Sequence, residues 1–138
     1  MAVHPTLLDI IRARKLINTY LQPTPMFRSP GFSDLLGVDL FIKHENFQPI
    51  RSFKIRGGLY SVSLLDETQK SRGVVTASTG NHGQGIAYAA SAMGVTAQVV
   101  VPHGTPKVKS EAIRHRGAEL IIHGHTIADG FEKAKEIS

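Results

Sequence analysis

The sequence predicts an α/β fold built on an open parallel sheet. Three short runs rich in Val and Ile, at residues 73–77, 97–101 and 119–123, have the length and composition of buried strands. The runs begin 24 and 22 residues apart. This spacing leaves room for one crossover helix between successive strands, and such connections make neighbouring strands parallel and right-handed.

Glycine and proline mark the expected ends of the helices. Gly94 and Gly117 stand just before the second and third runs, where a helix needs a residue in the left-handed conformation to terminate it. Thr105 and Pro106 predict a helix start, with the threonine as N-cap and the proline at the first helical position. A last helix is expected from near Thr126 to the end of the chain.

The first 50 residues have a different pattern. Apolar residues at helical spacing over residues 6–20 follow Thr6, and Asp9 stands three positions later as a variant of the capping box. An amphipathic helix is therefore expected there. The prolines that follow predict an extended path over residues 22–30, and residues 39–45 have the apolar content of a strand.

Composition narrows the classes of function. The chain has 138 residues, the size of one domain, and a formal net charge of +5. Its sixteen Lys and Arg residues are scattered and aromatic residues make up only 7%, so no nucleic-acid partner is expected. The absence of cysteine rules out disulfides and thiolate metal sites and suits a reducing compartment, so a cytoplasmic location is expected.

Neither a membrane segment nor a metal site is predicted. Asp9 and Arg12 interrupt the N-terminal apolar residues too early for a signal peptide, and no apolar run reaches the length that spans a membrane. His123 and His125 flank Gly124 at a strand end, but two ligands do not make a metal site and no third stands at a recognisable spacing.

The segment QPIRSFKIRGGLY, residues 48–60, places cations where a helix disfavours them. Lys54 and Arg56 fall in the first turn of an expected helix and Arg51 just before it. Helix N-termini carry partial positive charge and prefer acids. Either a bound anion compensates for these cations or one of them is kept unprotonated, and a neutral lysine is the form that attacks a carbonyl. Three solvated side chains remain the alternative interpretation.

The segment GVVTASTGNHGQG, residues 73–85, runs from a strand into a turn rich in hydroxyls and glycine that opens a helix. Such a turn offers free backbone N–H groups and a positive dipole to an anion. Its glycines follow neither the dinucleotide fingerprint nor the Walker pattern, so no nucleotide is implied. A turn that serves only tight packing of strand and helix would read the same way.

Taken together, these two segments resemble the lysine loop and asparagine loop of fold-type II pyridoxal-phosphate enzymes. The likeness is strongest to threonine and serine dehydratases (threonine ammonia-lyases) and serine racemase. It extends over residues 22–133, because PTPMFRSP, KHENFQPIRSFK and VPHGTPKVKSEAIRHRGAEL match the same family in the same order. The resemblance implies pyridoxal 5'-phosphate as cofactor and a small hydroxy amino acid, threonine or serine, as substrate.

The resemblance also implies roles for individual residues. The lysine matched by Lys54 forms the Schiff base with the cofactor, and the residue matched by Phe53 packs against the cofactor ring. The asparagine matched by Asn81 hydrogen-bonds the phenolic oxygen of the ring. The substrate carboxylate is received by the loop around it, made of Ser78, Thr79, Gly80, Asn81 and His82. The alternative role for His82 is to cap the turn, and the sequence pattern is the same for both roles.

The activity implied is β-elimination, which turns a hydroxy amino acid into a 2-keto acid and ammonia. Racemisation of serine is the alternative, because Thr79 could supply a proton donor on the second face of Cα, where serine racemase carries a serine hydroxyl. In elimination, Thr79 would orient the substrate carboxylate or cap the helix. A catalytically inactive α/β fragment or binding module is the alternative of another class.

Two features of the family are expected beyond residue 138, namely the glycine-rich loop for the cofactor phosphate and the polar partner of the pyridine nitrogen. The resemblance thus divides the chain into an N-terminal arm, residues 1–50, that belongs to a larger domain, and a smaller α/β domain, residues 51–138. It implies either a homo-oligomer or a chain that lacks a C-terminal portion.

Overall fold

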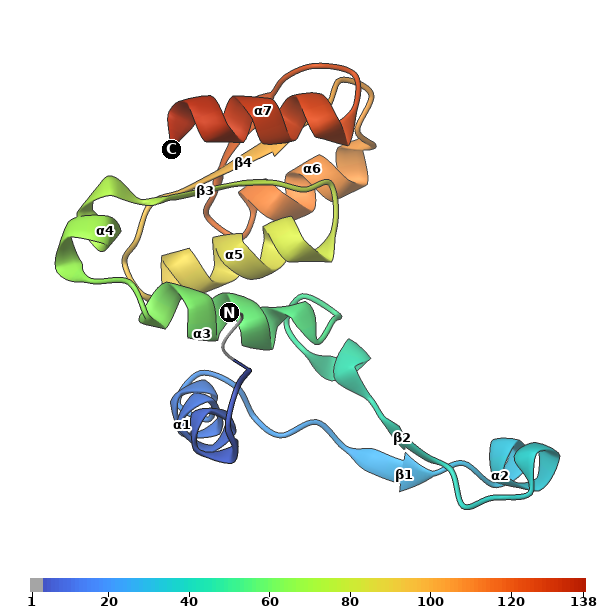
Figure 1. Cartoon of the computed structure of the whole chain (residues 1–138). Coiled ribbons are helices and arrows are strands. Elements are labelled where there is room, and N and C mark those ends of the chain that lie inside the picture. The colour runs from blue at the N-terminus through green and yellow to red at the C-terminus, as the bar shows by residue number, and fades with distance from the viewer. Residues whose placement is uncertain (1–3) are drawn as a thin grey trace. The chain divides into compact units, whose positions relative to one another are not determined.

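The computed structural model describes residues 4–138 and divides the chain into two compact units, Met1–Phe53 and Lys54–Ser138 (Figure 1). Over residues 4–138, the first unit holds two helices, a 3-10 turn and a two-stranded sheet, and the second holds five helices and a three-stranded sheet. Within the described residues, no helix has the length and apolar character that crossing a membrane requires.

The first unit opens with helix α1 (Leu7–Ile17), and its start confirms the capping box expected from the sequence. The backbone N–H of Asp9 donates to Thr6 Oγ1 at 3.3 Å, and the backbone N–H of Thr6 donates to Asp9 Oδ2 at 2.8 Å. These bonds satisfy amide groups that the first helical turn leaves unpaired. Only Ile17 of this helix is buried.

A small antiparallel hairpin follows, where the sequence predicted an extended segment and one strand. Strand β1 (Met26–Arg28) pairs with β2 (Phe41–Lys43), and Phe27 lies opposite Ile42. Between them lies helix α2 (Pro30–Leu36), which Gly37 terminates in the left-handed conformation, and a 3-10 turn, η1 (Glu45–Phe47), comes after β2. The pairing of β1 was missed because only three of its residues form a ladder.

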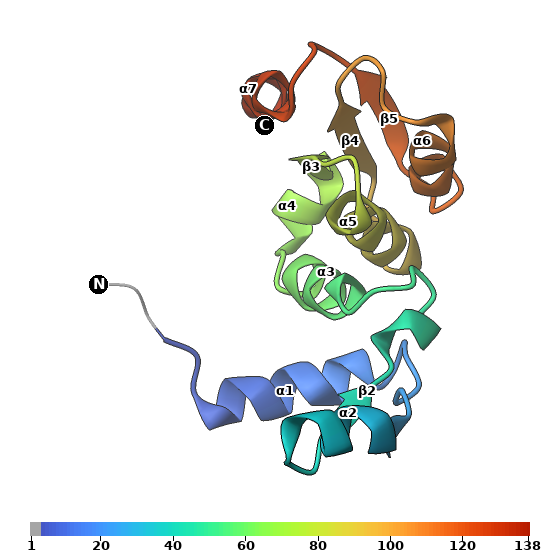
Figure 2. The same ribbon diagram turned by 90° about the vertical axis from the view of Figure 1, so that its right-hand side faces the viewer.

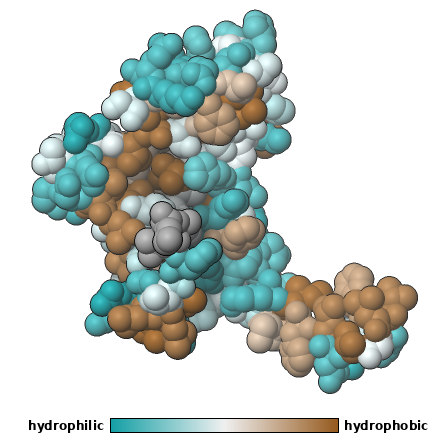
Figure 3. All heavy atoms as spheres, in the orientation of Figure 1, coloured by the Kyte–Doolittle hydropathy of each residue, from teal (hydrophilic) through white to brown (hydrophobic). Residues whose placement is uncertain are grey.

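This first unit leaves much apolar surface uncovered. Figure 3 shows hydrophobic residues over the outside of the segment that contains β1, α2 and β2. More than half of each of these side chains is exposed: Leu7, Leu8, Ile10, Ile11, Met26, Phe27, Phe32, Leu35, Leu36, Val38, Phe41 and Phe47. Exposed apolar surface on this scale is typical of a segment that packs against further protein.

The second unit is an α/β layer structure, which confirms the predicted fold class. Strands β3 (Val74–Ala77), β4 (Ala97–Val101) and β5 (Glu119–Ile122) form a parallel sheet in sequence order. Val74 pairs with Ala97, and Gln98 pairs with Glu119. The three strands lie within one residue of the runs that the hydrophobic pattern predicted.

Helices cover both faces of this sheet. The described helices of this unit are α3 (Lys54–Ser63), α4 (Glu67–Arg72), α5 (Asn81–Ala92), α6 (Lys107–Arg114) and α7 (Ile127–Ile137), and the last three contact the sheet. Helix α7 lies on one face against β3 and β4, and α5 and α6 lie on the other (Figure 2). The core under α7 is built from Ala77, Val100 and Ala134. Alternate residues of β4, Val99 and Val101, are fully buried on the opposite face.

The ends of these helices confirm most of the helix caps and terminators expected from the sequence. Gly94 and Gly117 have φ angles of 69° and 94°, the left-handed values that favour glycine. Thr126 caps α7 by accepting from the N–H of Asp129. The prediction for α6 was wrong by one residue, because Pro106 is itself the N-cap and the hydroxyl of Thr105 donates to the carbonyl of Pro102 instead.

Candidate functional site

Two helices bring the lysine segment and the glycine-rich turn together. Helices α3 and α5 lie side by side with their N-termini at the same end (Figures 1 and 2). The helices approach closely because Gly58 of α3 faces the backbone of Gly85 of α5, with no side chain between them. Both first turns lack an acidic residue. Two positive helix ends therefore meet at one place.

Lys54 is the first residue of α3 and is exposed. The helix begins at this lysine, so that Ser52 lies in the turn before it and Arg56 in its first turn. The concentration of cations expected from the sequence is thus present at the N-terminus of α3. The amine is carried on a rigid helix and stands at the end where α5 also begins.

The glycine-rich turn, residues 78–82, connects β3 to α5 at the carboxyl edge of the sheet. The N–H of Ser78 donates to the carbonyl of Val100 at 3.1 Å, which ties the turn to β4. The N–H of Gly80 donates to Ser78 Oγ at 3.2 Å, and Gly80 is the N-cap of α5. No side chain caps this helix. The first amides of α5 therefore remain available to an anion, as the sequence predicted.

His82 shares the electrostatic environment of Lys54. Partial burial of the imidazole lowers the pKa of His82, and the positive charge of Lys54 lowers that pKa further. The coupling places the two side chains within electrostatic range of each other across the α3–α5 contact. The neutral imidazole is accordingly the favoured form near pH 7.

Two further side chains of the turn have no partner within the described part of the chain. Thr79 is half-buried and Asn81 is exposed at the first position of α5, and neither side chain hydrogen-bonds to any of residues 4–138. The suggested capping role of Thr79 is not realised, because Gly80 occupies the N-cap position. The hydroxyl of Thr79 and the side-chain amide of Asn81 are therefore available to bind a ligand beside α3, the helix that carries Lys54.

Phe53 is the last residue of the first unit, and its side chain is 60% exposed. Two neighbours in that unit have features that sequence reasoning missed. Arg51 adopts a φ of 58°, which is costly for a residue with a side chain. The amide nitrogen of Gln48 is buried with no hydrogen-bond partner among the described residues. The sequence signals neither feature, because nothing around Arg51 indicates a positive φ and nothing around Gln48 indicates a buried amide.

Two other histidines, His103 and His125, lie in the loops that follow β4 and β5 at the carboxyl edge of the sheet. The rings of His103 and His125 are 5.5 Å apart between centroids, and the N–H of His103 donates to the carbonyl of Gly124 at 2.8 Å. Over residues 4–138, no three His, Asp or Glu side chains come together as a metal centre of three or more protein ligands would require. The pair joins two loops of the sheet edge.

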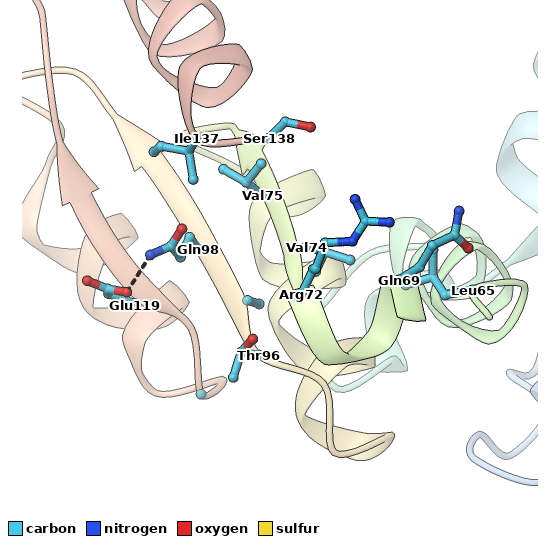
Figure 4. A pocket seen from close by; sticks show the side chains of 13 residues that line it. Leu65, Gln69, Arg72, Val74, Val75, Thr96, Gln98, Glu119, Ile137 and Ser138 are labelled. Atoms are coloured by element: carbon cyan, nitrogen blue, oxygen red, sulfur yellow. Dashed lines mark hydrogen bonds between the residues drawn. The ribbon is translucent and has the colours of Figure 1, made fainter. Parts of the chain in front are cut away.

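A hollow of about 900 Å³ lies at the other end of the strands (Figure 4). It is lined by the first residues of the three strands, by α4, and by Ile137 and Ser138 at the end of α7. Because the Ser78–His82 turn leaves the sheet at its carboxyl edge, the hollow and the candidate site are separate. A glutamine and a glutamate on its floor, Gln98 and Glu119, hydrogen-bond to each other at 2.7 Å.

Comparison with known proteins defines the class to which this fold and this arrangement of residues belong. Residues 17–138 match the family described as pyridoxal-phosphate dependent enzyme. The match includes both loops of the candidate site and nearly the whole described chain. This chain is a member of the pyridoxal-phosphate dependent enzyme family.

Individual relatives show which members of the family this chain is similar to. The chain is 39% identical over 129 residues to the catabolic L-threonine dehydratase of Escherichia coli strain K12, covering 94% of this chain and 39% of that protein. It is 37% identical over 132 residues to the L-threonine ammonia-lyase of Thermotoga maritima, covering 96% and 33% of the two chains. A solved serine racemase from Dictyostelium discoideum superposes with a TM-score of 0.88 at 39% identity, covering 96% and 43%.

The chain spans only part of each relative. It covers 39% of the catabolic and 23% of the biosynthetic L-threonine dehydratase of Escherichia coli strain K12. The comparisons confirm the resemblance to threonine dehydratases and serine racemase that the two loops predicted.

Proposed function

We propose that this chain carries the lysine and asparagine loops of a pyridoxal-phosphate dependent dehydratase, which eliminates water from threonine or serine. Hydrolysis of the resulting imine then takes up one water and gives a 2-keto acid and ammonia. The observation that carries the proposal is the meeting of two acid-free helix N-termini, one bearing Lys54 and the other bearing Asn81 and His82. Threonine dehydratases and a threonine ammonia-lyase among the relatives support the choice of substrate.

The residues fit the reactive part of the cofactor. A primary amine at the start of α3, an amide with no partner among residues 4–138 and a turn with free N–H groups supply a covalent attachment point, a hydrogen-bond donor and an anion site. When bound, pyridoxal phosphate withdraws electrons from Cα of the amino acid and so makes its proton removable. Lys54 would hold the cofactor, Asn81 would hydrogen-bond its phenolic oxygen, and Phe53 would pack against its ring.

The protein's own part in the reaction is orientation and proton transfer. The carboxylate of the substrate would accept hydrogen bonds from the Ser78–His82 turn, where the helix dipole of α5 favours negative charge. The amine of Lys54, on the neighbouring helix, would take the Cα proton. A neutral His82 keeps its lone pair available for a hydrogen bond from the ligand. Holding base and substrate on two packed helices supplies the alignment that proton transfer requires.

Racemisation of serine is the second candidate, and Thr79 is the observation that favours it. Its hydroxyl is not engaged with any of residues 4–138 and stands in the turn that would receive the carboxylate. A donor there could deliver a proton to the face of Cα opposite Lys54. Dehydration remains our preference, because β-branching restricts the rotamers of threonine and limits how its hydroxyl can be aimed.

The remaining assignments follow from the same proposal. Residues 1–50 would be an arm of a larger domain, which their exposed apolar side chains support. Residues 51–138 would be the smaller domain of the enzyme. The enzyme would assemble as a homo-oligomer and would be located in the cytoplasm.

A chimaera tests the function directly. The region of the Escherichia coli catabolic threonine dehydratase that matches this chain is replaced by residues 1–138, and 2-keto acid formation is measured from L-threonine and L-serine. We expect turnover of at least one substrate and its loss in the Lys54→Ala variant. A Lys54→Ala chimaera that retains turnover contradicts the proposal. D-serine that forms as fast as pyruvate, and that Thr79→Ala alone removes, would show the racemase instead.

A further inference from the structure

Two histidine side chains from different loops meet at the carboxyl edge of the sheet in the second unit. His103 lies in the loop between β4 and α6, and His125 lies in the loop between β5 and α7 (Figure 2). Their ring centroids are 5.5 Å apart, and the ring planes are inclined at 36°. The sequence places His125 next to His123 and gives no reason to connect it with His103. The tertiary structure therefore creates a pair of imidazoles that the residue spacing does not show.

Backbone hydrogen bonds hold the two loops together. The N–H of His103 donates to the carbonyl of Gly124 at 2.8 Å. The N–H of His123 donates to the carbonyl of Val101 at 2.9 Å. These bonds continue the pairing of β4 with β5 beyond the ends of the strands, so the Cα atoms of the two paired histidines are fixed by the sheet.

The carboxylate of Asp129 fixes the loop of His125 from the other side. The N–H groups of His125 and Thr126 donate to Asp129 Oδ2 at 2.7 and 2.9 Å. Gly124 packs so tightly against the side chain of Asp129 that a Cβ atom would have no room. Hydrogen bonds from the backbone of Thr126 and of His125 lower the pKa of Asp129, which keeps this carboxyl group ionised at neutral pH. A negative charge therefore lies beside this loop, which favours a bound cation.

The two imidazoles are available to a ligand. Both side chains are exposed, and neither hydrogen-bonds to any of residues 4–138. The contact between the two rings is the interaction that the structure gives them. A neutral imidazole has a ring nitrogen with a free lone pair, and this nitrogen is the commonest metal ligand in proteins.

The spacing of the rings suits a shared metal ion. Zinc binds an imidazole nitrogen at about 2.0–2.1 Å, so two imidazoles on one tetrahedral ion have ring centroids about 5 Å apart. The observed separation of 5.5 Å is close to this value. No third protein ligand joins the pair within the described residues, so water would fill the other positions. Such a site is open and exchangeable, unlike a closed structural centre.

We propose that His103 and His125 bind one divalent transition-metal ion of the zinc class. Imidazole suits zinc, copper and nickel, whereas magnesium prefers oxygen ligands. The bound ion would link the loop between β4 and α6 to the loop between β5 and α7. The inference does not rest on the proposed reaction, because it uses neither Lys54 nor the Ser78–His82 turn.

Zinc titration of the 138-residue chain, prepared without an affinity tag, tests the proposal. Calorimetry at pH 7.5 gives the affinity and the number of ions bound, and the ring signals in NMR spectra show which histidines respond. We expect the signals of His103 and His125 to change together, with one midpoint, at a lower zinc concentration than those of the other histidines. Separate midpoints for the two rings, or a parallel response of all histidines, would overturn the proposal.

Matched glutamine variants test the two ligands. His103→Gln and His125→Gln should each weaken zinc binding by at least about tenfold, because each removes a direct ligand. His115→Gln and His123→Gln make the same change at other exposed positions and should retain the affinity. Far-UV circular dichroism should be the same for all four variants, since none of these side chains is buried. An affinity that either ligand variant leaves unchanged, or that the controls reduce equally, would refute the assignment.

Stability and ion selectivity give the complementary readouts. An ion that binds the folded chain should raise the urea midpoint of unfolding, and this rise should disappear in His103→Gln. An excess of magnesium should neither raise the midpoint nor displace zinc, because it requires oxygen ligands. Equal stabilisation of the parent chain and His103→Gln by zinc, or displacement of zinc by magnesium, would contradict a site made by the two imidazoles.

Discussion

A Cβ atom added to Gly58 would lie 2.6 Å from the carbonyl oxygen of Gly85 and 2.8 Å from its carbonyl carbon. Both glycines stand four residues beyond the first residue of their helices, Lys54 in α3 and Asn81 in α5. The contact between them therefore holds the two helices together one turn away from the two side chains proposed to bind the cofactor. The separation of these side chains depends on the absence of a Cβ at position 58.

Gly58→Ala is expected to destabilise the second unit, because the obstructing atoms belong to the backbone of α5 and cannot rotate away. Overpacking of this kind costs about 1–3 kcal/mol. Gly57→Ala is the matched control, since an added Cβ at that position meets nothing within 4 Å. This substitution should stabilise the unit by about 0.5–1 kcal/mol, because it replaces a glycine inside a helix. Urea unfolding of the two variants measures the difference. Gly58→Ala that is as stable as Gly57→Ala would contradict the close contact.

The coupling between Lys54 and His82 predicts a change in titration. Removing the amine in Lys54→Met should raise the pKa of His82 toward its ordinary value, because one of the two causes of its depression disappears. Lys109→Met, on α6, removes the same charge elsewhere in the unit and should leave His82 unchanged. The imidazole chemical shift of His82, assigned with His82→Gln, is followed against pH. An unchanged pKa in Lys54→Met would show that the two side chains are not coupled.

The same depressed pKa makes stability depend on pH in a defined direction. The folded chain favours neutral His82, so below the ordinary histidine pKa of 6.5 the unfolded chain binds more protons. The free energy of unfolding should therefore fall as the pH drops below about 6.5, and should receive no contribution from His82 above it. The slope between pH 7 and 5 should decrease in His82→Gln. A slope that His82→Gln leaves unchanged would assign the effect to other groups.

The cap of α7 is expected to contribute measurably to the second unit. Thr126 Oγ1 accepts from the N–H of Asp129, and the carboxylate of Asp129 accepts from the N–H groups of His125 and Thr126. Thr126→Ala should lower the free energy of unfolding by about 1 kcal/mol, the usual loss for a threonine N-cap. Thr68→Ala, at an exposed position inside α4, is the control and should change stability little. Equal effects of the two substitutions would contradict the capping role.

The fold was predictable where local chemistry agrees with the tertiary arrangement. The capping boxes at Thr6 and Thr126, the left-handed glycines and the three Val- and Ile-rich runs each have a local cause that the sequence displays. Helix α4 was missed because it buries no residue and so has no apolar periodicity. The start of α6 was placed one residue early, since proline fits both the N-cap and the first helical position.

The two loops of the candidate site were predictable from the sequence, but the helix contact that brings them together was not. The resemblance identified Lys54 and residues 78–82, and the structure brings both to the same end of one helix pair. That pairing depends on Gly58 facing Gly85, and a glycine in a helix does not show from sequence which backbone it faces. The strained Arg51 and the buried amide of Gln48 are likewise results of the tertiary structure.

Competitive labelling tests whether Lys54 is the lysine that attaches the cofactor. The 138-residue chain is incubated with increasing pyridoxal phosphate and reduced with borohydride, and its labelled peptides are identified by mass spectrometry. We predict that Lys54 is modified at the lowest cofactor concentration, ahead of Lys43, Lys107 and Lys109. Modification of Lys43 or Lys107 before Lys54, or of all lysines in parallel, would show that Lys54 is not the attachment site.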